Sequence, residues 1–166
     1  AGTALTSGTG HVIIGRNAGD AITTMTDTVL VGYNAGSSLN HTDANGTTIV
    51  GRDAGEQLVS AIGTTLVGNR AGTVMTGSYN TALGDYVLAT GTGASNNTAV
   101  GYQAGRYLGD DGSSNHSSFN TVFGRSAMGG GDTSTPANNT AHLNTAIGHG
   151  ALGGGTTASR SEERRV

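Results

Sequence analysis

The sequence predicts an all-β fold, a parallel β-solenoid or β-roll of about eight coils of ~17 residues each. A short motif that ends in glycine recurs eight times, and this glycine is called the anchor glycine: Gly15, Gly32, Gly51, Gly68, Gly84, Gly101, Gly124 and Gly148. The residues before it are rich in Val, Ile and Leu, which is typical of strands. The chain of 166 residues has 30 Gly, no Trp and only 11% charged residues, so an ordinary globular core would be thin. A regular array of small units fits this composition better.

Each coil is expected to contain two short strands and two turns. The first strand ends at the anchor glycine. A weaker apolar position, as at Ile22, Leu39 and Leu58, indicates a second strand, and pairs such as Asn45-Gly46 indicate turns.

Two adjacent positions before the anchor glycine are apolar in every copy, although neighbouring strand residues point to opposite faces. The residue immediately before it is predicted to fill the coil: Ile14, Val31, Val50, Val67, Leu83, Val100, Phe123 and Ile147. The residue two before it is then predicted to point outward, onto the axis of a homo-oligomer: Ile13, Leu30, Ile49, Leu66, Ala82, Ala99, Val122 and Ala146. A strand that is apolar on both faces is buried on both, and another copy of the chain is the simplest cover.

One repeat domain is expected over residues 1–153, with loop insertions near 109–118 and 129–143, where the spacing of the anchor glycines lengthens. Residues 154–166 carry no repeat and are expected to be a tail or a junction to a missing C-terminal domain.

The stretch Asn97-Thr98-Ala99-Val100-Gly101, with its counterparts at 120–124 and 144–148, resembles the repeats of phage tail fibres and of trimeric autotransporter adhesin heads. The resemblance implies a left-handed β-roll homotrimer on a virion or at a cell surface. The repeat length favours the tail fibre. Residues 161–166 resemble the opening of the chaperone domain that follows many phage fibres, although a plain charged tail explains them equally well.

The expected function is therefore a structural and adhesive fibre segment for host attachment, with a bacterial adhesin head as the alternative. A polysaccharide-cleaving tailspike and an ice-binding solenoid are further alternatives. No carboxylate pair lies in a recognisable catalytic string and no histidines show metal-ligand spacing, so we expect no enzyme, no metal and no cofactor.

The expected partners are the chain itself and a host cell-surface glycan or protein. A net charge of −3 without a basic stripe gives no footprint for nucleic acid, and no apolar run is long enough for membrane insertion. The candidate receptor contacts are aromatic and acidic residues of the turns and loops: Tyr33, Tyr86, Tyr102, Asp110 and Asp111.

Overall fold

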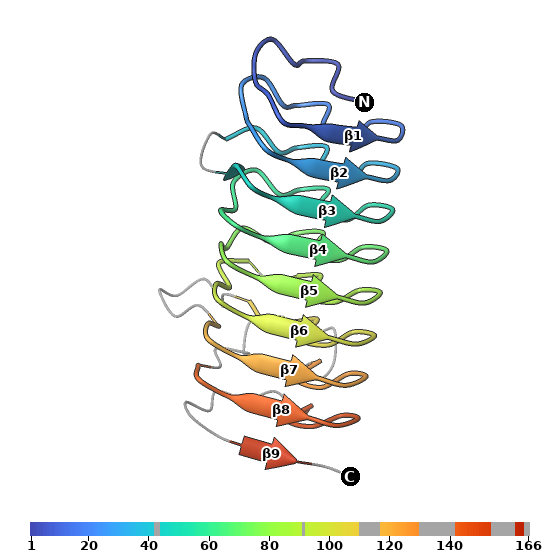
Figure 1. The fold of residues 1–166 in the computed structure, drawn as a ribbon. Helices are drawn as coiled ribbons and strands as arrows, with labels where there is room; N and C mark the ends of the chain where they lie inside the picture. The colour runs from blue at the N-terminus through green and yellow to red at the C-terminus, as the bar shows by residue number, and fades with distance from the viewer. Residues whose placement is uncertain (42–43, 91, 110–116, 130–141, 154–161, 165–166) are drawn as a thin grey trace.

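The computed structural model describes residues 1–41, 44–90, 92–109, 117–129 and 142–153, together with the backbone of 162–164. The chain winds as a stack of coils, and the strands lie one below another from the N-terminus to the C-terminus (Figure 1). Most of each predicted insertion lies outside the described residues. Asp110 and Asp111 lie outside them as well.

The strands of the described residues have three residues each: β1 (Val12–Ile14), β2 (Val29–Val31), β3 (Thr48–Val50), β4 (Thr65–Val67), β5 (Thr81–Leu83), β6 (Thr98–Val100), β7 (Thr121–Phe123), β8 (Thr145–Ile147) and β9 (Glu162–Arg164). They form one parallel sheet in chain order. Equivalent residues of successive coils pair, as Leu66 does with Ala82. The predicted all-β parallel solenoid is thus confirmed. Strand β9 continues the sheet into the segment 154–166, which was predicted to be a tail or a junction.

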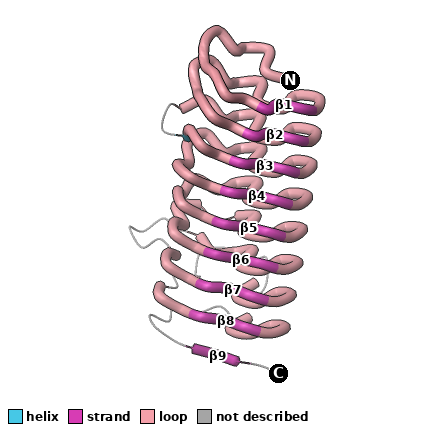
Figure 2. Tube along the Cα trace, in the orientation of Figure 1, coloured by secondary structure: helices cyan, strands magenta, loops and turns pink. Residues whose placement is uncertain are grey.

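Each described coil contains one strand, not the two that were predicted, and its remainder is turn (Figure 2). The cause is the backbone conformation after the anchor glycine. The second and fourth residues after it have positive φ, as at Arg70 (53°) and Gly72 (57°), whereas an extended strand needs negative φ. This turn half still bonds from coil to coil, since the amide of Gly19 donates to Ala35 O at 3.0 Å.

The middle residue of each strand points into the coil. The middle residues of β2 to β8 are fully buried, and Ile13 in β1 is partly buried. The first and last residues of the strands are more exposed: Ile14 retains 59% of its surface and Leu83 49%.

The predicted assignment of the two faces is therefore wrong. The residues assigned to a trimer axis lie inside a single chain: Ile13, Leu30, Ile49, Leu66, Ala82, Ala99, Val122 and Ala146. The residues assigned to the coil core face outward: Ile14, Val31, Val50, Val67, Leu83, Val100, Phe123 and Ile147. The physical reason is that the first and last residues of a three-residue strand share one face. The first residue is Thr in β3 to β8, and a hydroxyl column is better solvated outside.

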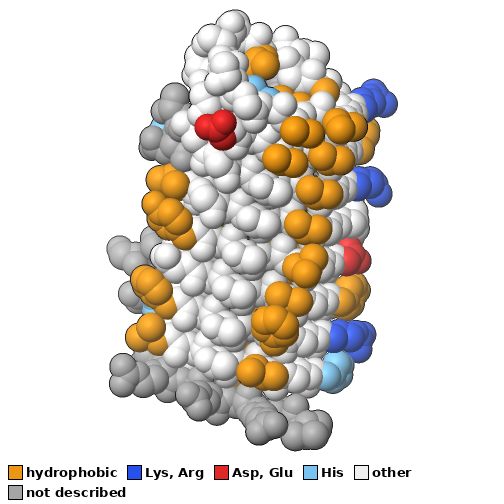
Figure 3. Space-filling view, viewed as in Figure 1, with side chains coloured by type: hydrophobic (Ala, Val, Ile, Leu, Met, Phe, Trp, Pro, Cys, Tyr) orange, Lys and Arg blue, Asp and Glu red, His pale blue; other side chains and the backbone are white. Residues whose placement is uncertain are grey.

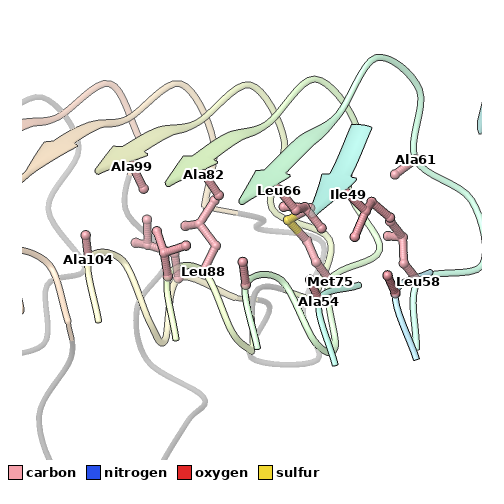
Figure 4. Close-up of a cluster of buried hydrophobic side chains, with 14 of the residues drawn as sticks. Ile49, Ala54, Leu58, Ala61, Leu66, Met75, Ala82, Leu88, Ala99 and Ala104 are labelled. Carbon is pink, nitrogen blue, oxygen red and sulfur yellow. The ribbon is translucent and has the colours of Figure 1, made fainter. Parts of the chain in front are cut away.

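Two further columns from the turn half complete the core. Opposite the strands lie small buried residues three positions after the anchor glycine: Ala18, Ala35, Ala54, Ala71, Val87, Ala104, Ala127 and Ala151. Larger buried side chains come from further along the turn half, among them Leu58, Met75 and Leu88. Figure 4 shows these side chains pointing toward Ile49, Leu66 and Ala82 from the strands. The interior is thus filled by two opposing walls of side chains.

A buried polar ladder runs beside this core, at the residue that precedes each of the strands β5 to β8. Asn80, Asn97, Asn120 and Asn144 are at most 1% exposed. The Oδ1 of Asn97 accepts from the backbone N and from Nδ2 of Asn120, both at 2.9 Å. The same pair of bonds joins Asn97 to Asn80 and Asn144 to Asn120. These bonds satisfy the buried amides and fix the register of neighbouring coils.

Substitution of matched leucines on the two faces tests the corrected orientation. Leu66→Ala should lower the free energy of unfolding by about 2–5 kcal/mol, because it leaves a cavity in the core. Leu83→Ala removes a half-exposed side chain and should cost less than about 1 kcal/mol per chain. Chemical denaturation at several protein concentrations separates the free energy of unfolding of the single chain from the free energy of any assembly. Equal losses at both positions would contradict the orientation.

The asparagine ladder predicts a graded effect at Asn97. Asn97→Ala removes the Oδ1 that accepts from the N–H and Nδ2 of Asn120, and each buried group that loses its acceptor should cost about 1–3 kcal/mol. Asn97→Thr should cost less, since Thr28, Thr47 and Thr64 occupy the equivalent position in earlier coils. Denaturant unfolding measures both variants. A Thr variant no more stable than the Ala variant would argue against the ladder.

Candidate interaction surfaces

The outward face of the sheet carries two parallel columns of uncharged side chains. The first residues of the strands give a column of Thr in β3 to β8, with Val12 and Val29 before it. The last residues give an apolar column that includes Leu83 (49% exposed), Phe123 (45%) and Ile147 (49%). Figure 3 shows this apolar stripe along the strands. None of the outward residues of β1 to β8 is charged, and an exposed apolar stripe of this kind is typical of an interaction surface.

A second apolar group lies at the corner that precedes the strands. Tyr79, Phe119 and Leu143 are 55%, 58% and 55% exposed, and their φ angles are 58°, 60° and 59°. The left-handed region costs an L-residue about 1–2 kcal/mol. Asp27 and Asn96, which tolerate it better, occupy the same position in other coils. Large apolar side chains are therefore held here at a cost to stability, as is found at functional positions.

The corner that follows the strands is polar and aromatic. The guanidinium of Arg16 lies 5.9 Å from the ring centre of Tyr33, and that of Arg125 lies 5.7 Å from Tyr102. Basic, acidic and histidine side chains line this edge in Figure 3. Of the candidate receptor contacts, Tyr33 and Tyr102 are each 41% exposed in different coils. They are available to a partner, but the structure does not combine them into one site.

Tyr86, the third candidate aromatic residue, lies instead in a shallow pocket of about 200 Å³ in the turn half of the coils. Arg70 and Arg106 place their guanidinium groups 5.4 and 5.0 Å from its ring centre. Arg70 Nη1 also donates to the Tyr86 hydroxyl at 2.8 Å. Sequence reasoning selected Tyr86 but did not bring it together with either arginine. Arg70 lies 16 residues before it at the same position of the neighbouring repeat, and Arg106 lies 20 residues after it at another position.

Asp53, an acidic residue beside Arg70 of this pocket, is already paired. Asp53 is 5% exposed, accepts from Asn34 Nδ2 at 3.0 Å and lies 3.3 Å from Arg52 Nε and 3.8 Å from Arg70 Nε. Across the described ranges, no three His, Asp or Glu side chains are grouped as metal ligands would be. The same residues contain no helix long and apolar enough to cross a membrane.

Comparisons with models of known protein families, with curated proteins and with solved structures find no match to this chain. The proposed function therefore rests on the surfaces described above.

The strained corner predicts that Phe119 does not stabilise the fold. Phe119→Asn removes a ring that is 58% exposed and places at φ 60° a residue that tolerates this conformation, so the free energy of unfolding should stay equal or rise by up to about 1 kcal/mol. Phe123→Asn is the matched control in strand β7 and should lower stability, since Asn is unfavourable in strands. Denaturant unfolding compares the two. A clear loss of stability in the Phe119 variant would show that its ring supports the fold.

Proposed function

We propose that this chain is a structural and adhesive fibre segment that assembles with copies of itself and attaches to a host surface. The observation that carries the proposal is the continuous outward apolar column, which includes Ile14, Leu83 and Phe123. It runs along a sheet whose strands are in register from β1 to β8. A rigid stripe of this kind needs a partner with the same repeat along its length. A second copy of the chain has that repeat.

A homotrimer on a virion, as part of a tail fibre, is the form that the resemblance of the repeats favours. A cyclic arrangement lets every copy bury the same outward face and leaves no copy with that face open. The head of a bacterial trimeric adhesin is the alternative and would use the same interface. In either case the mechanism is mechanical: a stiff rod presents its remaining surfaces several times, and weak contacts add up to avidity.

An ice-binding protein is a second candidate, and the Thr column favours it. Thr48, Thr65, Thr81, Thr98, Thr121 and Thr145 face outward in six successive strands. Their regular spacing, with an apolar residue two positions on, gives a flat array that an ordered lattice could match. This candidate requires a free outward face and therefore a monomer.

Charge placed on the outward face tests the assembly. Light scattering of the parent chain should give a multiple of 16.4 kDa, with three copies expected. Leu83→Asp and Phe123→Asp should reduce the mass to that of one chain, because like charges would repeat around the interface, while the circular dichroism spectrum stays that of the parent. Leu5→Asp is the matched control, since Leu5 is also exposed (38%) but lies outside the strands.

A parent chain that is monomeric would contradict the fibre proposal. Thermal hysteresis of such a monomer, lost in a Thr98→Tyr variant, would then establish the ice-binding candidate. Unchanged mass in both Asp variants would show that the copies meet through another surface.

A further inference from the structure

The pocket beside Tyr86 lies in the turn half of the coils and not on the outward strand face. Its walls include Arg70 and Tyr86, two residues after the anchor glycines of neighbouring coils, and Glu56 and Arg106, five residues after theirs. Thr73 and Thr90 provide hydroxyl groups. Four successive coils thus contribute to one depression, which no single repeat contains.

Arg106 has no anionic partner in the described part of the chain. Its guanidinium lies 5.0 Å from the ring centres of both Tyr86 and Tyr107. Its Nε is buried and has no hydrogen-bond partner. A buried donor without an acceptor is costly and needs an explanation. The two rings hold the guanidinium in place, as cation–π contacts do. Because Nε is closed to solvent, a ligand in the pocket would meet this charge through the Nη groups.

The charges that line the pocket favour a ligand with a single negative charge. Two guanidinium groups, of Arg70 and Arg106, face one carboxylate, of Glu56. Arg70 is in addition partly compensated by Asp53 at 3.8 Å. The lining therefore carries a net charge of +1, although the chain as a whole carries −3. A carboxylate matches both this charge and the planar fork of donors that a guanidinium presents. A doubly charged phosphate matches it less well.

The rest of the lining fits one sugar residue. The Thr90 hydroxyl donates to Arg106 O at 2.8 Å and the Thr73 hydroxyl to Arg70 O at 2.9 Å, so both hydroxyl oxygens still have acceptor capacity for sugar O–H groups. Val74 and Ala89 supply an apolar wall. At about 200 Å³ the pocket is smaller than the ~300–1,000 Å³ of sites for larger ligands. It would hold one residue of a longer chain.

We propose that this pocket binds the carboxylate of an acidic sugar, a uronic acid residue of a surface polysaccharide, with Arg106 as the principal contact. The proposal rests on the proposed attachment function and names its ligand class. Arg70 orients Tyr86 and adds positive charge, Thr73 and Thr90 accept from sugar hydroxyls, and Glu56 weakens the attraction for anions enough to disfavour phosphate.

Titration of the purified chain with glucuronate, followed by NMR or calorimetry, tests the site. Glucuronate should bind, and glucose should bind at least about 10-fold more weakly, since it lacks the charged acceptor. Arg106→Gln should weaken glucuronate binding by a similar factor. Arg125→Gln is the control, because Arg125 also contacts a tyrosine ring but lies outside the pocket. It should leave the Kd unchanged.

Glu56→Gln is a second variant that tests the site even if the Arg106 variant fails to fold. Removal of this carboxylate should strengthen glucuronate binding severalfold, a gain that a damaged fold would not produce. Equal affinity for glucose and glucuronate, or an unchanged Kd in the Glu56 variant, would overturn the proposal. Tighter binding of inorganic sulfate or phosphate than of glucuronate would also overturn it and indicate a simple anion site.

The same titration on the Leu83→Asp variant separates this proposal from the assembly proposal. If that variant is monomeric and retains the parent's Kd per chain, the sugar site does not depend on assembly. If the parent proves monomeric but binds glucuronate, the assembly proposal fails and the sugar site stands. If the parent assembles but shows no preference for glucuronate, the sugar-binding proposal is contradicted and the assembly proposal is supported.

Discussion

The close stacking of the coils at the anchor glycines is the constraint on which the structure depends. A Cβ added at Gly68 would lie 2.1 Å from the carbonyl oxygen of Gly84, and Gly32 and Gly51 meet the next coil in the same way. Their φ angles of 137° to 145° are also outside the range that other residues adopt readily. The backbones can therefore approach this closely only where glycine recurs at each coil. This requirement makes the motif visible in the sequence and keeps the face of the sheet straight.

A thin core is sufficient for such a stack because the backbone supplies much of the order. Strands bond in register along the sheet, the turn halves bond from coil to coil, and the asparagines before β5 to β8 bond across three interfaces. The inward side chains are then free to be as small as Ala82 and Ala99. The outward face, in contrast, contributes little to the interior of its own chain. Large apolar groups such as Phe123 on that face are best explained by the proposed partner that would cover it.

The repeat period predicted the strands and their parallel order, because glycine spacing and β-branched residues report directly on backbone geometry. It did not give the inward direction, since two adjacent apolar positions fit either orientation. The deciding signal was present: Thr98 and Val100 share one face, so a column of Thr marks that face as outward. The second strand was predicted wrongly because Leu58 and its equivalents are buried without being extended.

The pocket could not be predicted at all. It joins residues from different positions of different repeats, and only the folded stack shows that Arg70 and Arg106 meet at Tyr86.

The two proposed surfaces use different parts of each coil, and this separation is what a fibre requires. Assembly would bury the outward residues of the strands, whereas the pocket is built from residues two to six positions after the anchor glycine. Burial of one surface therefore need not cover the other. The pocket also departs from the repeat, since Tyr86 and Arg106 have no counterparts of the same type at their positions in the other described coils. In the proposed assembly, one weak site per chain would become several per rod through symmetry, and simultaneous contacts with a polysaccharide bearing the same acid group at intervals would raise the overall affinity. A regular scaffold with one irregular pocket would thus combine stiffness with selectivity.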